Sequence, residues 1–402
     1  MSAHFLAQCL SWFVGGALVV FTARRLCFVV AACLPPRPLA QERREPSILL
    51  VLAARNEAAI AASALRSIEQ VRYPADKLDI ALVDDASCDG TGKLFARWAA
   101  TRERCRVVTV SRDVQQPGGK SRALAAGVAA SPAADMIVVM DADFEMASDG
   151  LSLLVAGLSA PDVGAVSGFL QPRNAGQNIV ARYAALESRL HQLVTSAAKD
   201  RLRLDPPTIG VWMVRRDALA AVGGFPDCPT GEDVQVASAL TRHGWTTRFV
   251  SSVVATNAVA ATLAEYWWQH LRWARDVYAS GRGVSSVPGC DARASERLLS
   301  ASGYADRFAL AGGAALAALG AMPVEIVFVY AGTIILEIIV ALRLDGERRA
   351  GEIMRVLAAV AGMFVVDVAA TAAATVQTLA GIRRSWHRPD RTPGPVHASR
   401  AS

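Results

Sequence analysis

Short apolar runs alternate with helix-like segments through the middle of the chain. Between the first two runs, apolar residues recur at helical spacing, as at Ile60, Leu65 and Ile68. Near-continuous apolar strands separated by helices are typical of a parallel sheet that is covered on both faces. We therefore predict an α/β domain with a mainly parallel sheet at residues 46–260. The predicted strands are residues 47–54, 79–83, 106–110 and 136–140.

A longer apolar stretch occupies residues 5–23, and a helix needs about 20 such residues to cross a hydrocarbon core. A cleavable signal peptide is the alternative, but it would carry basic residues before the apolar run, whereas Arg24 and Arg25 follow it. We predict an uncleaved anchor at residues 1–36, lengthened or tilted by the short apolar run 26–34. The positive flank predicts that the following domain lies in the cytoplasm.

Three more apolar blocks lie at residues 308–322, 324–342 and 356–382. Three crossings would leave the basic tail at residues 383–402 outside, whereas an interfacial first block would return it to the cytoplasm. The pattern leaves both alternatives open. We predict membrane helices within residues 305–382, followed by a basic, disordered tail.

Three carboxylates interrupt these blocks, at Glu325, Glu337 and Asp367. Because a charge in lipid is costly, we expect them to face a protein interior or an aqueous path. Contact with helix ends near the membrane interface is the alternative.

Composition agrees with membrane ends and a globular middle. Hydrophobic residues make up 52% of the chain and charged residues 19%, and the apolar excess is concentrated at the two ends. The net charge is +6, with arginines clustered beside apolar runs, which favours membrane lipid headgroups over nucleic acid as a partner. The seven cysteines are odd in number and scattered, and no two have metal-ligand spacing. Nothing in their pattern suggests a disulfide framework, which agrees with a domain that faces the cytoplasm. The high alanine and arginine content suggests a bacterial source, hence an integral protein of the bacterial plasma membrane.

Two acidic residues, Asp84 and Asp85, follow the second predicted strand. Ligands of such sheets bind beyond the carboxyl ends of the strands. The first strand is not followed by G-x-G-x-x-G, which argues against a dinucleotide-binding fold. The paired carboxylates could accept hydrogen bonds from a base and from ribose hydroxyls. An ordinary turn is the alternative, because Asp and Ser also cap their own backbone.

Asp141 and Asp143 follow the fourth predicted strand directly and bring two like charges to one strand end. Hard oxygen ligands suit Mg²⁺ or Mn²⁺, which would also bind two phosphates and stabilise charge on a leaving diphosphate. Solvated loop acids are the alternative.

Glu232 and Asp233 stand at the start of a helical pattern at residues 234–240. Acidic residues there complement the helix dipole, which explains one acid more easily than two. A carboxylate at this place could deprotonate an acceptor hydroxyl.

An amphipathic stretch at residues 263–278 carries Gln269, His270, Arg272 and Trp273. Anchoring at the membrane interface is one explanation, and residues 261–304 are predicted to be an interfacial segment. Arg can also bind a diphosphate through charge-assisted hydrogen bonds, and Trp can stack on a sugar. His270 is unconvincing as a metal ligand, because no second His or Cys lies at metal spacing.

In order and spacing, these motifs resemble the family 2 inverting glycosyltransferases with a GT-A fold, over roughly residues 47–280. The membrane-bound branch with hyaluronan, chitin, cellulose and poly-N-acetylglucosamine synthases is the most similar. The resemblance implies that Asp84 and Asp85 contact the uridine of a UDP-sugar and that Lys120 lies beside the donor. Ala54-Arg55-Asn56-Glu57 matches the opening loop, which assigns Asn56 and Glu57 to the donor side. Ala125 departs from the family pattern, which has Asn there.

The same resemblance implies that Asp143 is the principal metal ligand, with Asp141 near the ribose or the outer shell of the metal. It implies that Asp233 is the catalytic base, with Glu232 beside it on the acceptor side. Gln269, Arg272 and Trp273 match the Q-x-x-R-W signature of polymerising members, with Gln269 and Trp273 near the acceptor or product and Arg272 at the donor diphosphate.

The implied function is inverting transfer of a sugar from a UDP-sugar to a growing polysaccharide, with β-glycosidic bonds as the product. Transfer of one sugar to a membrane lipid is the leading alternative. A catalytically silent membrane scaffold is a third hypothesis, and the intact Asp143 and Asp233 argue against it, because unused charges would be destabilising.

Overall fold

The computed structural model describes residues 3–40, 45–111, 119–131, 133–228, 230–281, 296, 299–300 and 304–382. These residues form two compact units, and the chain passes between them after Pro38, Leu170, Pro206 and Ala258. The α/β unit comprises Leu39–Leu170 and Pro207–Ala258. The helical unit comprises the described residues of Met1–Pro38, Gln171–Pro206 and Val259–Arg384. The predicted domain at residues 46–260 thus also contains a segment, Gln171–Pro206, that packs within the helical unit.

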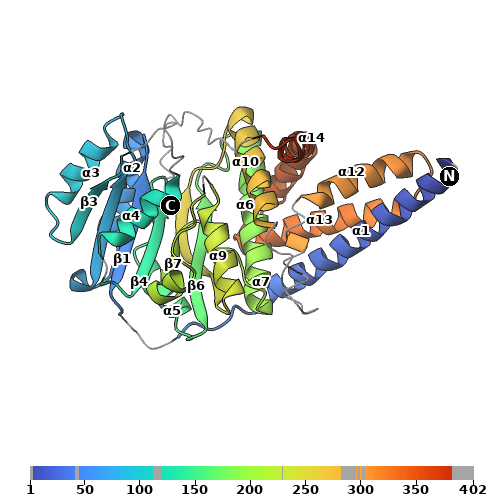
Figure 1. Ribbon diagram of the computed structural model, residues 1–402. Helices are drawn as coiled ribbons and strands as arrows, with labels where there is room; N and C mark the ends of the chain where they lie inside the picture. The colour runs from blue at the N-terminus through green and yellow to red at the C-terminus, as the bar shows by residue number, and fades with distance from the viewer. Residues whose placement is uncertain are drawn as a thin grey trace. The chain divides into compact units, whose positions relative to one another are not determined.

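An eight-stranded sheet forms the centre of the α/β unit, in the order β3-β2-β1-β4-β7-β6-β8-β5 (Figure 1). β1, β2, β3 and β4 run parallel to one another, as predicted. β7 then runs antiparallel to both β4 and β6, and β5 runs antiparallel to β8. The strands are β1 (Ile48–Ala54), β2 (Leu78–Asp84), β3 (Cys105–Thr109), β4 (Met136–Asp141), β5 (Glu145–Met146), β6 (Val163–Pro172), β7 (Trp212–Arg215) and β8 (Thr246–Asn257).

Strand β1 shows why the central strands are apolar throughout. Leu50 and Leu52 belong to one buried cluster, whereas Leu49 and Val51 belong to another. Successive side chains of a strand point to opposite faces, so both faces of the sheet are buried, as the sequence predicts. The helices of this unit are α2 (Ala58–Glu69), η1 (Ala75–Lys77), α3 (Thr91–Ala99), α4 (Lys120–Ala129), α5 (Gly150–Gly157), α8 (Arg216–Ala221) and α9 (Glu232–Arg242).

The helical unit contains three helices that are long and apolar enough to cross a membrane, among the described residues. They are Ala7–Cys33, Val324–Leu344 and Ala350–Leu379. The first of these helices ends at Cys33, so it contains nearly all of the short apolar run at residues 26–34. The other elements are α1 (Ala3–Cys33), α6 (Ile179–Arg189), the π-helical η2 (Leu190–Ser196), α7 (Ala197–Leu202), α10 (Leu263–Gly281), α12 (Ala305–Ala318), α13 (Val324–Leu344) and α14 (Ala350–Leu379).

The block at residues 308–322 forms most of α12, which has 14 residues. That length is shorter than the roughly 20 residues that a crossing needs, in agreement with the alternative in which this block does not span. The basic tail at residues 383–402 and most of residues 282–303 lie outside the described parts of the chain.

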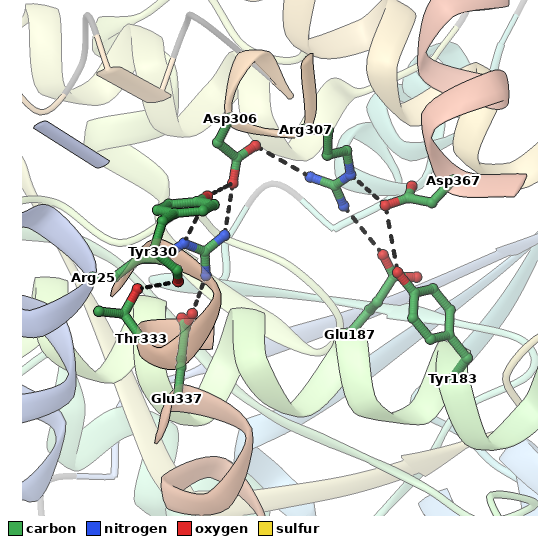
Figure 2. A network of polar contacts seen from close by, with 9 residues as sticks. All are labelled: Arg25, Tyr183, Glu187, Asp306, Arg307, Tyr330, Thr333, Glu337 and Asp367. Atoms are coloured by element: carbon green, nitrogen blue, oxygen red, sulfur yellow. Dashed lines mark hydrogen bonds and ion pairs between the residues drawn. The ribbon is translucent and has the colours of Figure 1, made fainter. Parts of the chain in front are cut away.

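Two of the three carboxylates in the apolar blocks are buried and paired (Figure 2). Glu337 pairs with Arg25, and Asp367 pairs with Arg307. Glu325 is instead exposed in the first turn of α13, where a negative charge complements the helix dipole. The prediction of an interior position is therefore wrong for Glu325.

The arginines that were expected to flank the anchor lie inside α1. Arg24 pairs with Glu296 at 2.7 Å, and Arg25 pairs with Asp306 at 2.6 Å as well as with Glu337. A buried guanidinium group needs such partners, because an unpaired charge in a low-dielectric interior is costly. These two arginines therefore have carboxylate partners within the helical unit.

Candidate active site

The acidic pairs of the α/β unit stand at one edge of its sheet. Asp84 ends β2 and Asp141 ends β4, and β1 lies between them. The register pairs Ala54 with Asp84 and Ala53 with Asp141. Because adjacent strands are about 4.8 Å apart, the two acidic backbone positions are about 10 Å apart, one on each side of β1. Two carboxylates thus reach the carboxyl edge of the parallel strands, as predicted.

The loop after β1 is tied to the loop after β2. Asn56, in the left-handed region at φ 53°, accepts a hydrogen bond from the backbone N–H of Cys88 at 2.8 Å. The N–H of Asn56 donates to Ser87 Oγ at 3.0 Å, and the N–H of Glu57 donates to Thr91 Oγ1 at 2.8 Å. The amide oxygen of Asn56 therefore joins the two loops, a structural role that the sequence motif did not indicate.

The two acids after β2 have different surroundings. Asp84 accepts a hydrogen bond from the N–H of Ser87 at 3.0 Å, as in an ordinary turn. Asp85 is buried, and burial raises the pKa of its carboxyl, while the charges of Arg55 and Arg122 oppose that rise. The sequence did not single out these two arginines, although they lie close to Asn56 and Lys120 in the chain.

Lys120 connects two acidic motifs that are far apart in the chain. It is the first residue of α4, and its Nζ lies 2.5 Å from Asp141 Oδ1 and 2.8 Å from Glu232 Oε1. Burial alone would lower the pKa of Lys120, but the carboxylates of Asp141 and Glu232 raise it above its ordinary value. The lysine is therefore a fixed positive charge between the end of β4 and the start of α9.

Asp233 follows Glu232 in the first turn of α9 and is half-buried. Burial raises the pKa of its carboxyl to about 7, the Glu232 carboxylate adds to this rise, and Lys120 opposes it. Thr208 Oγ1 donates to the backbone oxygen of Asp233 at 3.0 Å, which fixes this turn. A carboxyl that titrates near neutral pH has the proton affinity that a general base needs.

Asp141 and Asp143 point to the same side of their segment. The alternate residues Ala142 and Phe144 are buried, which leaves the two acids on the more open side. Burial raises the pKa of Asp141 against the opposing charge of Lys120, and the nearby charge of Asp143 adds to the rise. Oxygen-only donors with adjacent negative charge fit Mg²⁺ or Mn²⁺.

The Q-x-x-R-W residues belong to the helical unit, on α10. Gln269 and Arg272 are half-exposed and Trp273 is exposed, whereas His270 between them is buried. The motif residues therefore share the more open side of α10, and His270 turns toward neighbouring helices.

Comparison with known proteins identifies a family. The family model described as "Glycosyltransferase like family 2" matches residues 46–276, which is more than half of the chain. The probable glycosyltransferase YdaM of Bacillus subtilis is 27% identical over 234 residues, covering 57% of this chain and 55% of the relative. A beta-monoglucosyldiacylglycerol synthase of Synechocystis is 28% identical over 238 residues, covering 58% of this chain and 48% of the relative.

A further relative is an N-acetylglucosaminyltransferase of Neorhizobium galegae, 30% identical over 245 residues, covering 58% of this chain and 55% of the relative. This chain thus spans about half the length of the curated relatives it matches. Among solved structures, the mannosyltransferase PcManGT of Pyrobaculum calidifontis, in complex with GDP-Man and Mn²⁺, matches with a TM-score of 0.65. The sequence identity is 24%, over 94% of this chain and 99% of that chain, so the likeness concerns the fold.

The predicted resemblance is confirmed at the level of the family, while the synthase branch remains a prediction. The matched segment contains all three acidic pairs, Lys120 and the Q-x-x-R-W motif. This chain belongs to the family 2 glycosyltransferases and has a GT-A-like fold, with three candidate membrane-spanning helices in the part of the chain that the structure describes.

Proposed function

We propose that this chain is a metal-dependent, inverting glycosyltransferase that moves a sugar from a UDP-sugar to an acceptor held at a membrane. The observation that carries the proposal is the Asp233 carboxyl, whose pKa is raised to about 7 beside Glu232 and the Lys120–Asp141 ion pair. The proposed base and the charges proposed to bind the diphosphate would then lie at one edge of a family 2 sheet. A catalytically silent membrane scaffold would need neither a base nor charges that bind a diphosphate.

The reaction proposed for this site is a single displacement. Asp233 accepts the proton of an acceptor hydroxyl, and the oxygen attacks the anomeric carbon opposite the departing UDP. The new C–O bond forms as the sugar–phosphate bond breaks, so the configuration inverts and an α-linked donor gives a β-glycoside. Lys120 supplies positive charge near the departing phosphates, whose charge grows during bond cleavage. Arg272 is a second proposed cation for the diphosphate.

Asp143 and Asp141 are the residues proposed to hold a divalent metal. Their oxygen donors fit Mg²⁺ and Mn²⁺ equally. When bound, such an ion neutralises charge on the diphosphate leaving group. Asp84 and Asp85 are proposed to contact uridine, with Asp85 as the buried partner for the base.

A growing polysaccharide is the first proposed acceptor, because α10 carries the Q-x-x-R-W residues on its more open side. A lipid is the second, supported by relatives that are named as beta-monoglucosyldiacylglycerol synthases.

A bacterial plasma membrane with the α/β unit in the cytoplasm is the proposed location. The exposed, unpaired thiol of Cys88 supports a reducing compartment.

Product size tests the proposed function. Membranes that contain the chain would be incubated with labelled UDP-sugars and Mg²⁺ or Mn²⁺, and the labelled product would be sized. We expect a glycosidase-sensitive polymer that is missing when Asp233→Asn is used. A single labelled glycolipid that depends on Asp233 would select the lipid acceptor instead. If the label does not depend on Asp233 for any UDP-sugar, the proposed function is wrong.

The pH dependence of turnover tests the role of Asp233 separately. Because only the carboxylate form accepts a proton, kcat/KM should fall about tenfold per pH unit below pH about 7. Lys120 opposes the raised pKa of Asp233, so Lys120→Met should move this fall to higher pH. Lys93→Met, an exposed position on α3, is the matched control and should leave the profile in place. An unshifted profile for Lys120→Met would show that Lys120 does not tune the base.

A further inference from the structure

Three ionisable side chains from three helices meet inside the helical unit. Glu187 is on α6, His270 on α10 and Asp367 on α14. One ligand atom of each lies within 4.8 Å of the other two. His270 and Asp367 are buried, and Glu187 is half-buried. None of the three belongs to the candidate active site of the α/β unit.

Neighbouring groups already orient each of these side chains. Arg307 pairs with Glu187 Oε1 at 3.3 Å and with Asp367 Oδ2 (Figure 2). One oxygen of each carboxylate is therefore held by the same guanidinium group. Tyr266 donates its hydroxyl to Glu187 Oε2 at 2.9 Å. Metal-binding carboxylates and histidines in proteins are held by such outer partners, which fix the ligand atoms in place.

The tautomer of His270 follows from its backbone contact. Its Nδ1 lies 2.9 Å from the carbonyl oxygen of Tyr266, and a carbonyl can only accept, so Nδ1 carries a proton. Nε2 faces Glu187 Oε2 at 2.8 Å. At this distance a protonated His270 donates Nε2–H to Glu187, and only in the neutral imidazole does Nε2 present a lone pair toward the carboxylates. Histidine ligands commonly have this arrangement, with the other ring nitrogen bound to a carbonyl.

One oxygen atom of this cluster has no hydrogen-bond partner among the described residues. Asp367 is only 2% exposed, and its Oδ1 has no hydrogen-bond partner among the described residues. A buried oxygen without a partner carries the full cost of its lost hydration. That cost points to a ligand that the oxygen would bind.

The charge of the surrounding network favours a divalent ion. In Figure 2, Arg25 and Arg307 are the two cations, facing four carboxylates: Glu187, Asp306, Glu337 and Asp367. A protonated His270 would leave one negative charge in this buried network. A divalent cation with a neutral imidazole would bring the network to neutrality, which a low-dielectric interior favours.

We propose that Glu187, His270 and Asp367 form a divalent-cation site in the helical unit that joins α6, α10 and α14. One imidazole and two carboxylates suit Zn²⁺ or Mn²⁺ rather than Ca²⁺. Ligand atoms about 2.1 Å from an ion lie about 3.4 Å apart in a tetrahedral site and at most about 4.2 Å apart on opposite sides of the ion, so separations of up to 4.8 Å have to contract when the ion binds. Such an ion fixes the rotation of α10, the helix that presents Gln269, Arg272 and Trp273.

Counting bound metal tests this site without any activity measurement. The full-length Asp143→Asn protein, which lacks the principal proposed metal ligand of the α/β unit, would serve as the parent in detergent. It would be stripped with chelator, reloaded with Zn²⁺ or Mn²⁺ without nucleotide, gel-filtered and analysed for metal. We expect one ion per chain in the parent and loss of that ion with His270→Gln. The matched control is His243→Gln, because His243 Nδ1 also contacts a carbonyl oxygen four residues earlier, at 2.9 Å, but His243 is exposed and follows the end of α9.

The possible outcomes distinguish a bound metal ion from a protonated His270. Parent protein that elutes as a single peak without metal would show that an imidazolium fills the place, and the proposal would be overturned. Equal metal in the His270→Gln and His243→Gln proteins would also overturn it. If His270→Gln does not fold, Co²⁺ loading of the parent decides, because four- or five-coordinate ligation by an imidazole nitrogen and two carboxylates gives visible bands that are shifted and much stronger than the weak band of free aqueous Co²⁺. Absence of these bands counts against the site.

Discussion

Asp233→Asn is expected to lower turnover by about 10²- to 10⁴-fold, the usual contribution of a general base. The asparagine has nearly the same size, and the N–H of Val234, which donates to Asp233 Oδ1 at 2.8 Å, can still donate to its amide oxygen. Fold and donor binding should therefore persist while proton acceptance is lost. Initial rates on purified protein at saturating donor, together with donor affinity, measure the effect.

The matched control for this substitution is Asp76→Asn, an exposed acid of the same unit in η1. It removes the same charge without touching the carboxyl edge of the sheet and should leave kcat within twofold, as is usual for an exposed position. If Asp233→Asn retains the parent rate, Asp233 is not the base, and Glu232 becomes the next residue to test.

Asp143→Asn is expected to have the second large effect, a loss of at least about 10²-fold in kcat/KM at a fixed metal concentration. A neutral amide is a weaker ligand than a carboxylate for Mg²⁺ or Mn²⁺, and stabilisation of a leaving diphosphate by the ion is worth several kcal/mol. The apparent metal concentration for half-maximal rate should rise in parallel. Turnover measured against Mg²⁺ and Mn²⁺ concentration gives both quantities.

Asp149→Asn provides the comparison, because Asp149 is an exposed acid shortly after Asp143 that makes no side-chain cap to α5. Its metal titration should match that of the unmodified chain. An unchanged metal requirement in Asp143→Asn would remove Asp143 from the metal site and leave Asp141 alone to carry the proposal.

The parallel part of the sheet could be predicted because its strands are buried on both faces. The runs at residues 47–54 and 136–140 lie within one residue of β1 and β4, since nearly every position is apolar. The antiparallel half of the sheet was harder to predict from the sequence. β6 contains Gly164, Ser167 and Gly168, and only packing against β7 and β8 makes such a segment a strand.

The acidic motifs were predictable and their connections were not. Each pair stands directly after an apolar strand or before a helix, which is a local signal. The contacts of Lys120 with Asp141 and Glu232 depend on how α4, β4 and α9 meet, and no local pattern contains that information. The cluster at His270 was missed for the same reason, because a search for a second His or Cys nearby excludes carboxylates from distant helices.

The discontinuity of the α/β unit has a consequence for synthesis on the ribosome. β7 lies between β4 and β6 in the sheet, but it is translated only after the segment Gln171–Pro206 of the helical unit. Until then β4 lacks the neighbour on one side, and β6 lacks both β7 and β8. Nascent chains at this stage carry open strand edges, which promote aggregation. Completion of the sheet therefore has to wait until a segment of the helical unit has left the ribosome. Slow membrane insertion or slow folding of that segment would delay the α/β unit as well.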